Sequence, residues 1–447
     1  MSFLAAAPDT QRPRVGIGAA VAAAERQARR SLLRNHGGGH APVSYLELFV
    51  DLVFVFAITQ LSHFLKVQLN LTGLLEAVVL FLAIWWAWMY TTWATNWANP
   101  ERIEIRLMLL AIMLLSLVMA VALPHAFAQH AGLFAGCYLA LQIGRSAFMA
   151  VAMERESPRN GRNMQRIAIW FTASGLFWII GVLRGDHERL GWWALAMTIE
   201  YLGPAAMFWV PRLGRSKGSD WDISGSHMAE RCALFVIIAL GEGIIITGAA
   251  FAQLALEATR SFAFLIAFLS SVLMWWLYFD LGAERGSQHI RNHAEPGRVA
   301  RNAYTYLHMP IVLGIVIAAV GDALLLQQPD GPATVQLIAV QTGGAILFLT
   351  GLGLFKRYSN TMGNFPMSHV IAMVLFGFLG MSASYDPMAA LQFGALGAAI
   401  FLLAAIWEWV SYHGGWVERA ERLGLNMPAR IKARAERRRA DVEARRG

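Results

Sequence analysis

Charged residues are scarce in this chain. Asp, Glu, Lys and Arg make up 15% of its 447 residues, whereas hydrophobic residues make up 57%. A typical soluble domain is about 25% charged and roughly 45–50% apolar. The shortage of charge excludes an ordinary soluble globular protein and predicts an all-α protein that crosses a membrane many times.

Cysteine is also scarce, and several catalytic motifs are missing. The two cysteines, Cys137 and Cys232, fall in apolar segments that the topology below places at opposite depths of the bilayer, so neither a disulfide nor a metal framework is expected. The sequence has no P-loop, no G-x-S-x-G nucleophile elbow and no HExxH zinc motif. We therefore expect no metal ion and no cofactor, and the case for a primary pump or a familiar protease is weak.

Apolar runs of about twenty residues, the length of a membrane-spanning helix, follow one another along the chain. Basic residues crowd alternate loops and both tails, while the intervening loops have few. By the positive-inside rule both termini lie in the cytoplasm. This topology also accounts for the net charge of +8, so no nucleic-acid partner is expected. The predicted spans, about twelve, cover residues 45–65, 72–96, 104–123, 132–153, 165–183, 190–210, 230–251, 261–283, 302–326, 334–355, 366–384 and 388–409.

A weak internal repeat divides the predicted spans into two sets of six. The first span contains AITQ (57–60) where the seventh has ALGE (239–242), and the second contains WWAW (85–88) where the eighth has WWLY (275–278). The matches predict two parallel six-helix halves, although a chance likeness between apolar helices stays open. The predicted segments are a basic cytoplasmic arm (1–43), a first half (44–210), a cytoplasmic linker (211–228), a second half (229–410) and a basic cytoplasmic tail (411–447).

Contact with the lipid bilayer explains two further groups of residues. The tryptophans, those at 85, 86, 88, 93 and 97 among them, are expected mostly near the membrane interfaces as aromatic anchors. The Arg-rich tail that follows Trp416 is expected to touch anionic lipid headgroups.

Two acids stand in the first half of the first span, where lipid exposure would cost a few kcal/mol each. Glu47 and Asp51 are four residues apart and share one helix face. At 100° per residue, Ser62 returns to within about 20° of Asp51, which extends a partly polar stripe along the helix. Because such acids normally face a protein interior or a water cavity, both are candidates for proton or ion coupling.

The seventh span carries a second set of charges. Glu242 lies near mid-helix between Gly241 and Gly243, where a locally weakened helix could open to line a cavity, and we favour a functional role for it. Glu230 and Arg231 are expected at the cytoplasmic mouth, where an ion pair or a lipid contact is the simpler interpretation.

Further polar groups follow in the eighth and ninth spans. By the predicted topology Asp280 and His308 lie in the cytoplasmic half of the membrane, at the depth of Glu47 and Asp51. Carboxylates and a histidine at one depth suit proton relay or cation binding. A structural network between helices is equally open, and Asp280 could be an interfacial cap. Supporting candidates are His63, Asp322 and the pair of Arg145 with Glu200, which we interpret as architectural.

Three of these stretches resemble one protein family. They are Glu47 to His63 (ELFVDLVFVFAITQLSH), His227 to Glu242 (HMAER through ALGE) and His308 to Asp322 (HMPIVLGIV through GD). Over roughly residues 42–409 the chain resembles the bacterial low-temperature-requirement protein A (LtrA) family. The resemblance implies a multi-pass inner-membrane protein linked by name to growth in the cold, and it implies no established substrate or reaction.

Three functions stay open at this point. The leading hypothesis is a secondary transporter or ion-conducting protein, in which Asp51, Glu242 and His308 exchange protons or bind a cation and an unknown small solute or ion is the partner. An intramembrane enzyme acting on lipid is less favoured, because it needs a nucleophile or a metal that the sequence does not show. A membrane sensor or scaffold would depend on the basic tail. The oligomeric state, including a homo-oligomer, is open.

Overall fold

The structure is a computed structural model. It describes residues 31–34, 43–217, 224–280, 301–359 and 365–412, together with short pieces of the tail between 417 and 436. Most of the predicted basic arm and tail therefore lies outside the described residues.

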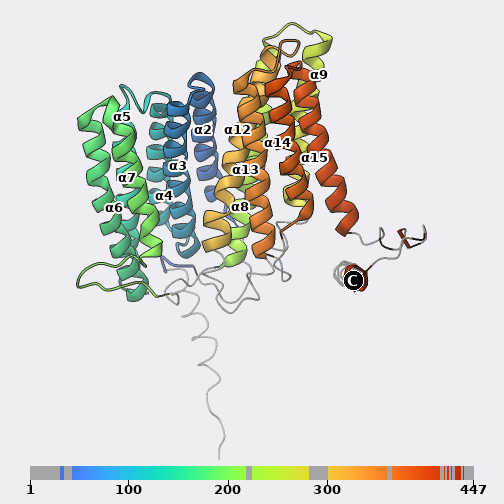
Figure 1. Ribbon diagram of the computed structural model, residues 1–447. Coiled ribbons are helices and arrows are strands. Elements are labelled where there is room, and N and C mark those ends of the chain that lie inside the picture. The colour runs from blue at the N-terminus through green and yellow to red at the C-terminus, as the bar shows by residue number, and fades with distance from the viewer. Residues whose placement is uncertain are drawn as a thin grey trace, which may run out of the picture.

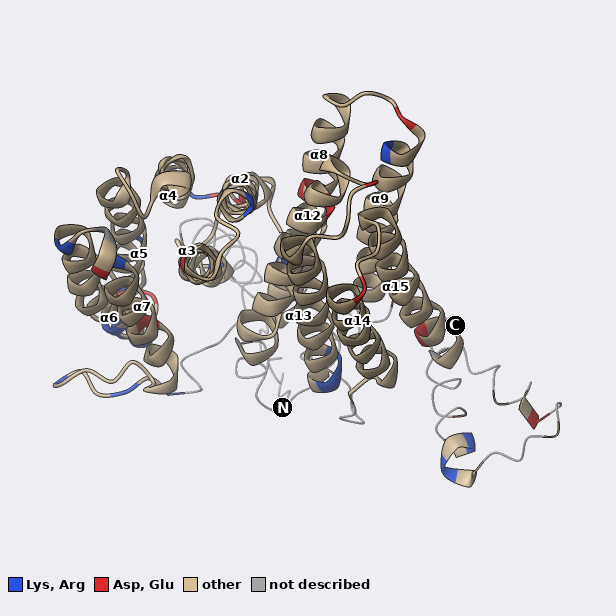
Figure 2. Cartoon of the chain, turned by 45° about the horizontal axis from the view of Figure 1, so that its top comes forward, with Lys and Arg blue, Asp and Glu red and all other residues tan. Residues whose placement is uncertain are grey.

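Twelve long helices fill the described chain and confirm the predicted all-α membrane fold, one helix for each predicted span (Figure 1). They run side by side and alternate in direction, and Figure 2 shows how few charged residues they carry. The first six are α2 (Tyr45–Val67), α3 (Leu71–Trp97), α4 (Ile103–Ala122), α5 (Ala131–Met153), α6 (Pro158–Arg184) and α7 (Asp186–Ala205). The second six are α8 (Gly225–Ala252), α9 (Ala258–Phe279), α12 (His308–Gln327), α13 (Val335–Ser359), α14 (Met367–Tyr385) and α15 (Ala390–Tyr412).

Among the described residues, 11 helices are long and apolar enough to cross a membrane, and the chain is a multi-pass membrane protein. The twelfth, α7, is long enough but less apolar, because it carries Glu188, Arg189 and Glu200. Arg189 and Glu200 are buried against the neighbouring helices, so α7 depends on its protein neighbours rather than on a uniformly apolar surface.

The same helix pairs form in both sets of six. In the first set α2 packs on α3 and α4, the chain continues through the pairs α4–α5, α5–α6 and α6–α7, and α7 returns to α3. In the second set α8 packs on α9 and α12, followed by α12–α13, α13–α14 and α14–α15, and α15 returns to α9. The shared pairing is compatible with the weak sequence repeat, and the relation between the two sets stays a prediction. Below, the two sets of six helices are called the first half and the second half. The two sets meet where α2 touches α8 and α12 and where α3 touches α8.

The tryptophans of α3 are core residues, which corrects the prediction that they anchor the membrane interfaces. Trp85, Trp86 and Trp88 are each at most 1% exposed. Trp86 stacks on Tyr201 of α7 with ring centroids 3.9 Å apart. The sequence pattern missed this because α3 is wrapped by α2, α5, α7 and α8, so its apolar residues face protein on nearly every side. Trp275 and Trp276 on α9, by contrast, are 46% and 41% exposed and suit the anchoring role.

Candidate functional site

Four ionisable side chains meet where the two halves touch. Glu47 and Asp51 come from α2, and His227 and Arg231 come from α8; we call these four residues the charge cluster. All four are 0% exposed. An isolated ion in such a place would be very costly, so the cluster can exist only because its members neutralise and hydrogen-bond one another.

Local sequence explains why the cluster residues lie at matching positions near the starts of α2 and α8. Ser44 caps α2 and forms a capping box with Glu47, and Ser224 caps α8 by accepting a hydrogen bond from the backbone N–H of His227. Each cap places the first cluster residue in the first turn of its helix. The second cluster residue follows four positions later on the same helix face.

Arg231 is the central cation of the charge cluster. Its Nε donates to Asp51 Oδ2 at 3.0 Å, and its Nη2 donates to Asp51 Oδ1, so the guanidinium grips this carboxylate with two parallel bonds. Its Nη1 donates to Glu47 Oε1 at 3.2 Å and to Thr95 Oγ1 at 3.1 Å. One arginine of the second half therefore holds both acids of the first half.

Glu47 also binds two further cation-capable groups. Arg34, in the segment before α2, donates from Nη2 to Glu47 Oε2 at 2.7 Å. His227 Nε2 lies 2.9 Å from Glu47 Oε1. With two carboxylates and two guanidinium groups, the formal charges of Glu47, Asp51, Arg34 and Arg231 sum to zero, which is what burial requires.

The tautomer of His227 follows from its second neighbour. The amide of Asn96 is oriented by the backbone of Ser224, since its Oδ1 accepts from Ser224 N–H at 3.0 Å and its Nδ2 donates to Ser224 C=O at 3.0 Å. The same Nδ2 lies 3.3 Å from His227 Nδ1, which must then accept. A neutral His227 therefore carries its proton on Nε2 and donates it to Glu47.

An aromatic layer covers the charge cluster on the side toward the middle of the helices. Trp88 donates from Nε1 to Asp51 Oδ1 at 2.7 Å, and its ring lies 4.2 Å from that of Phe235, one turn beyond Arg231 on α8. Trp85 packs on both rings, with centroids 5.0 and 5.9 Å away. These side chains leave the cluster enclosed by protein rather than open to a passage.

A cavity of about 320 Å³ lies at the opposite end of the same helix interface. Its polar wall comes from the last turns of α2, and its apolar wall comes from α8 and α12. The lining residues are Thr59, Gln60, Ser62, His63 and Lys66 on α2, Ile246 on α8, and Ala319, Val320 and Ala323 on α12. Among the described residues no partner binds the side chains of Gln60, Ser62, His63 or Lys66.

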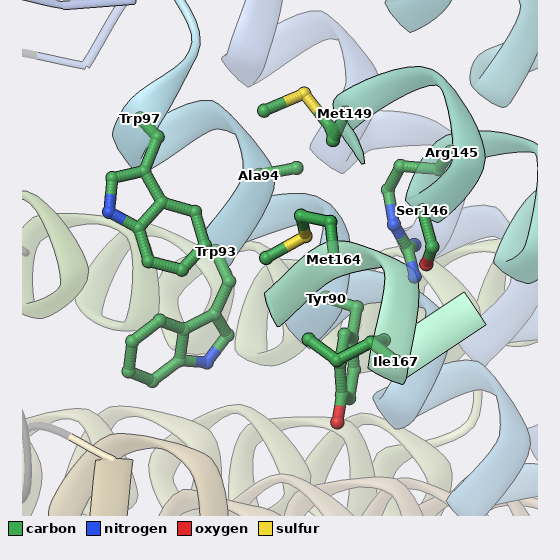
Figure 3. A pocket seen from close by; sticks show the side chains of 9 residues that line it. All are labelled: Tyr90, Trp93, Ala94, Trp97, Arg145, Ser146, Met149, Met164 and Ile167. Carbon is green, nitrogen blue, oxygen red and sulfur yellow. The ribbon is translucent and has the colours of Figure 1, made fainter. Parts of the chain in front are cut away.

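The other two pockets of note are too small for a solute. Figure 3 shows one between α3, α5 and α6, where Arg145 and Ser146 are the polar groups beside Tyr90 and two methionines. Its volume is about 10 Å³, and that of a pocket beside Asp322 and Gln341 is about 20 Å³. Such volumes hold roughly one water molecule each.

Residues 42–406 match the sequence profile of the bacterial low temperature requirement A protein (LtrA). The chain belongs to the LtrA family. The uncharacterized protein RA0937 of Rhizobium meliloti (strain 1021) is 40% identical over 383 residues, which cover 85% of this chain and 92% of the relative. No solved structure matches at a significant level.

In this LtrA-family chain the structure gathers some of the predicted site residues and separates others. Glu47 and Asp51 share the charge cluster. His308 lies elsewhere: its Nε2 is 2.8 Å from the hydroxyl of Tyr278, and its Nδ1 is 3.0 Å from the carbonyl of Ala303. Glu242 lies three turns beyond Arg231 along α8, and Asp280 is an exposed residue at the end of α9. The proposed acids and histidine therefore do not form one hydrogen-bonded site.

Arg231 corrects the simplest sequence interpretation. A residue expected at the membrane mouth, against lipid or its neighbour Glu230, is instead fully buried between the halves. Glu230 is only partly buried, on another face of α8. The spacing of His227 and Arg231, which matches that of Glu47 and Asp51, was the available signal. Arg34 carried no such signal, because its position depends on a backbone pairing of Leu33 with Ala98 at the end of α3.

Three of the remaining supporting residues, Arg145, Glu200 and Asp322, each lie inside one half, and the fourth, His63, lies between the halves. Arg145 does not bind Glu200 directly: it donates to Gln142, Gln142 donates to the hydroxyl of Tyr138 at 3.1 Å, and Tyr138 donates to Glu200 at 2.5 Å. Asp322 and Gln341 line the same small pocket. His63 lines the cavity. Among the described residues no three His, Cys, Asp or Glu side chains are grouped so that they could hold a metal ion.

Proposed function

We propose that this protein is a proton-coupled secondary transporter of the bacterial inner membrane, with both termini in the cytoplasm. One observation carries the proposal: the charge cluster takes two acids from the first half and a histidine and an arginine from the second, at the point where α2 meets α8. The fully buried cluster is therefore a connection between halves, and its strength depends on charge.

The chemistry of the cluster links protonation to movement. In a transporter built from two halves, rocking of one half against the other exposes the solute site to each side in turn. A proton added to Asp51 would remove its ion pair with Arg231, and the guanidinium would then be held by Glu47 and Thr95 alone. His227, which donates its Nε2 proton to Glu47, is positioned to pass a proton to the same network. Loss of these bonds weakens the α2–α8 contact without changing any apolar packing.

The other hypotheses find less support. A lipid-acting enzyme needs reactive groups that lipid can reach, whereas the members of the charge cluster are 0% exposed. A sensor that depends on the basic tail rests on residues mostly outside the described chain.

Flux in proteoliposomes tests the proposal. Wild type, Asp51→Asn and Glu47→Gln would be compared with an interior pH dye under an imposed pH gradient, with a panel of cations and small anions outside. We expect both substitutions to reduce coupled proton flux at least about tenfold, since each removes a charge-dependent bond between the halves.

Glu408→Gln is the matched control. Glu408 is paired with Lys356 at 2.6 Å, and both lie within the second half. This variant also breaks an ion pair between helices, so it should lose stability while coupled flux persists. Equal flux in wild type and the two cluster variants, with all proteins folded, would refute the proposal.

A further inference from the structure

The cavity between α2, α8 and α12 has the character of a binding site for an anion. Its polar wall offers the ammonium group of Lys66, the amide of Gln60, the hydroxyl of Ser62 and the imidazole of His63. None of these four side chains is engaged by another described residue, so their hydrogen bonds are available to water or a ligand. At about 320 Å³ the cavity is within the usual size range of small-molecule sites, roughly 300–1,000 Å³.

The charges near the cavity define which ion it would accept. No carboxylate stands among the described residues that line it. Asp322 is adjacent in sequence to the lining residue Ala323, but it turns toward Gln341 and a separate pocket. Glu242 precedes the lining residue Ile246 by one helical turn and is not part of the wall. The lining thus has one fixed positive charge, that of Lys66, and no negative charge.

The opposite wall adds a second requirement. Ile246, Ala319, Val320 and Ala323 present only apolar side chains to the cavity. A ligand that satisfies both walls has one anionic end and a short apolar body. A divalent anion would exceed the single positive charge, and a cation would face Lys66.

We propose that this cavity is the solute site and that it binds small aliphatic monocarboxylates, the carboxylate at Lys66 and its neighbouring donors and the chain against α8 and α12. The inference rests on the transport function proposed above, because it names the class of solute. It also gives α2 two roles: the charge cluster at one end senses protons, and the last turns hold the anion.

Equilibrium binding tests this inference without any gradient. Radiolabelled butyrate would be titrated at pH 7 onto the full chain in nanodiscs of a neutral lipid, with butylamine, a cation of similar shape, and inorganic phosphate as competitors. We expect saturable butyrate binding that neither competitor displaces. Lys66→Gln should weaken binding about 10–100-fold, as expected for the loss of a charge-assisted hydrogen bond.

Two further variants keep the test specific. Arg184→Gln removes an exposed cation from the end of α6 and should leave butyrate affinity within about twofold of wild type. Ala323→Phe would fill the cavity from the apolar wall and should abolish binding while Lys66 stays in place.

Several results would overturn the inference. The inference would be wrong if the wild-type chain did not bind butyrate. It would also be wrong if Lys66→Gln and Ala323→Phe left butyrate binding unchanged. Another such result is displacement by butylamine. Displacement by added phosphatidylglycerol would assign the cavity to a lipid headgroup instead. Because binding needs no proton coupling, these outcomes do not bear on the proposed role of the charge cluster. Intact butyrate binding without proton flux would instead refute the transport function.

Discussion

The two ends of the α2–α8 interface handle polar groups in opposite ways. Near the start of both helices, Glu47, Asp51, His227 and Arg231 are fully buried and bind one another. Near the end of α2, Gln60, Ser62, His63 and Lys66 face a cavity instead. Burial with complete pairing produces a rigid connection, whereas polar groups left beside open space favour hydration or a ligand. Helix α2 therefore carries the paired charge cluster near its start and the unpaired polar wall of the cavity near its end.

The largest loss of stability should come from breaking the charge cluster. Arg231→Met leaves Asp51 buried without a cation and leaves Glu47 with Arg34 as its only guanidinium partner. Losing one member of a buried ion pair costs about 3–5 kcal/mol. We expect a strong loss of thermal stability, measured by size-exclusion chromatography of heated protein.

The double variant Asp51→Leu with Arg231→Met sharpens this result. Replacing both members of a buried pair by apolar groups is often close to neutral, so part of the stability should return. A single variant as stable as wild type would show that the cluster does not hold the halves together.

A smaller effect should follow from removing one donor. Trp88→Phe deletes the hydrogen bond from Nε1 to Asp51, and hydrogen bonds to charged groups contribute about 1.5–3 kcal/mol. Stability would be measured by chemical denaturation in detergent. Trp86→Phe is the matched control. Trp86 lies two residues before Trp88 on α3, and its indole N–H is buried without a hydrogen-bond partner in the described structure. Equal losses in both variants would assign the effect of Trp88 to packing alone.

The smallest effect on stability should come from a substitution in the polar wall of the cavity. Lys66→Gln removes a side chain that binds no other described residue, so stability should stay within about 0.5 kcal/mol of wild type in the same denaturation assay. A loss above about 2 kcal/mol would show that Lys66 stabilises the fold, and the contrast between the two ends of α2 would disappear.

Sequence patterns predicted most of the fold, because span length and apolar composition depend only on the bilayer. They also singled out Glu47 and Asp51, since acids in an apolar run need partners. The partners themselves were harder to predict: Arg231 lies 180 residues beyond Asp51, and only tertiary packing shows which face of α8 meets α2. Trp85 and Trp88 were misjudged for the same reason, since burial by neighbouring helices and burial at a membrane interface favour the same residue types.

The separation of Asp51 from Arg231 along the chain also bears on how the protein is made. At roughly 5–20 residues per second, the ribosome needs about 10–40 seconds to add the 180 residues between them. During that interval Arg34, already synthesised, can neutralise Glu47, whereas Asp51 has the indole N–H of Trp88 as a donor but no cation. The nascent first half must therefore keep this acid protonated, hydrated or shielded by the insertion machinery until α8 emerges.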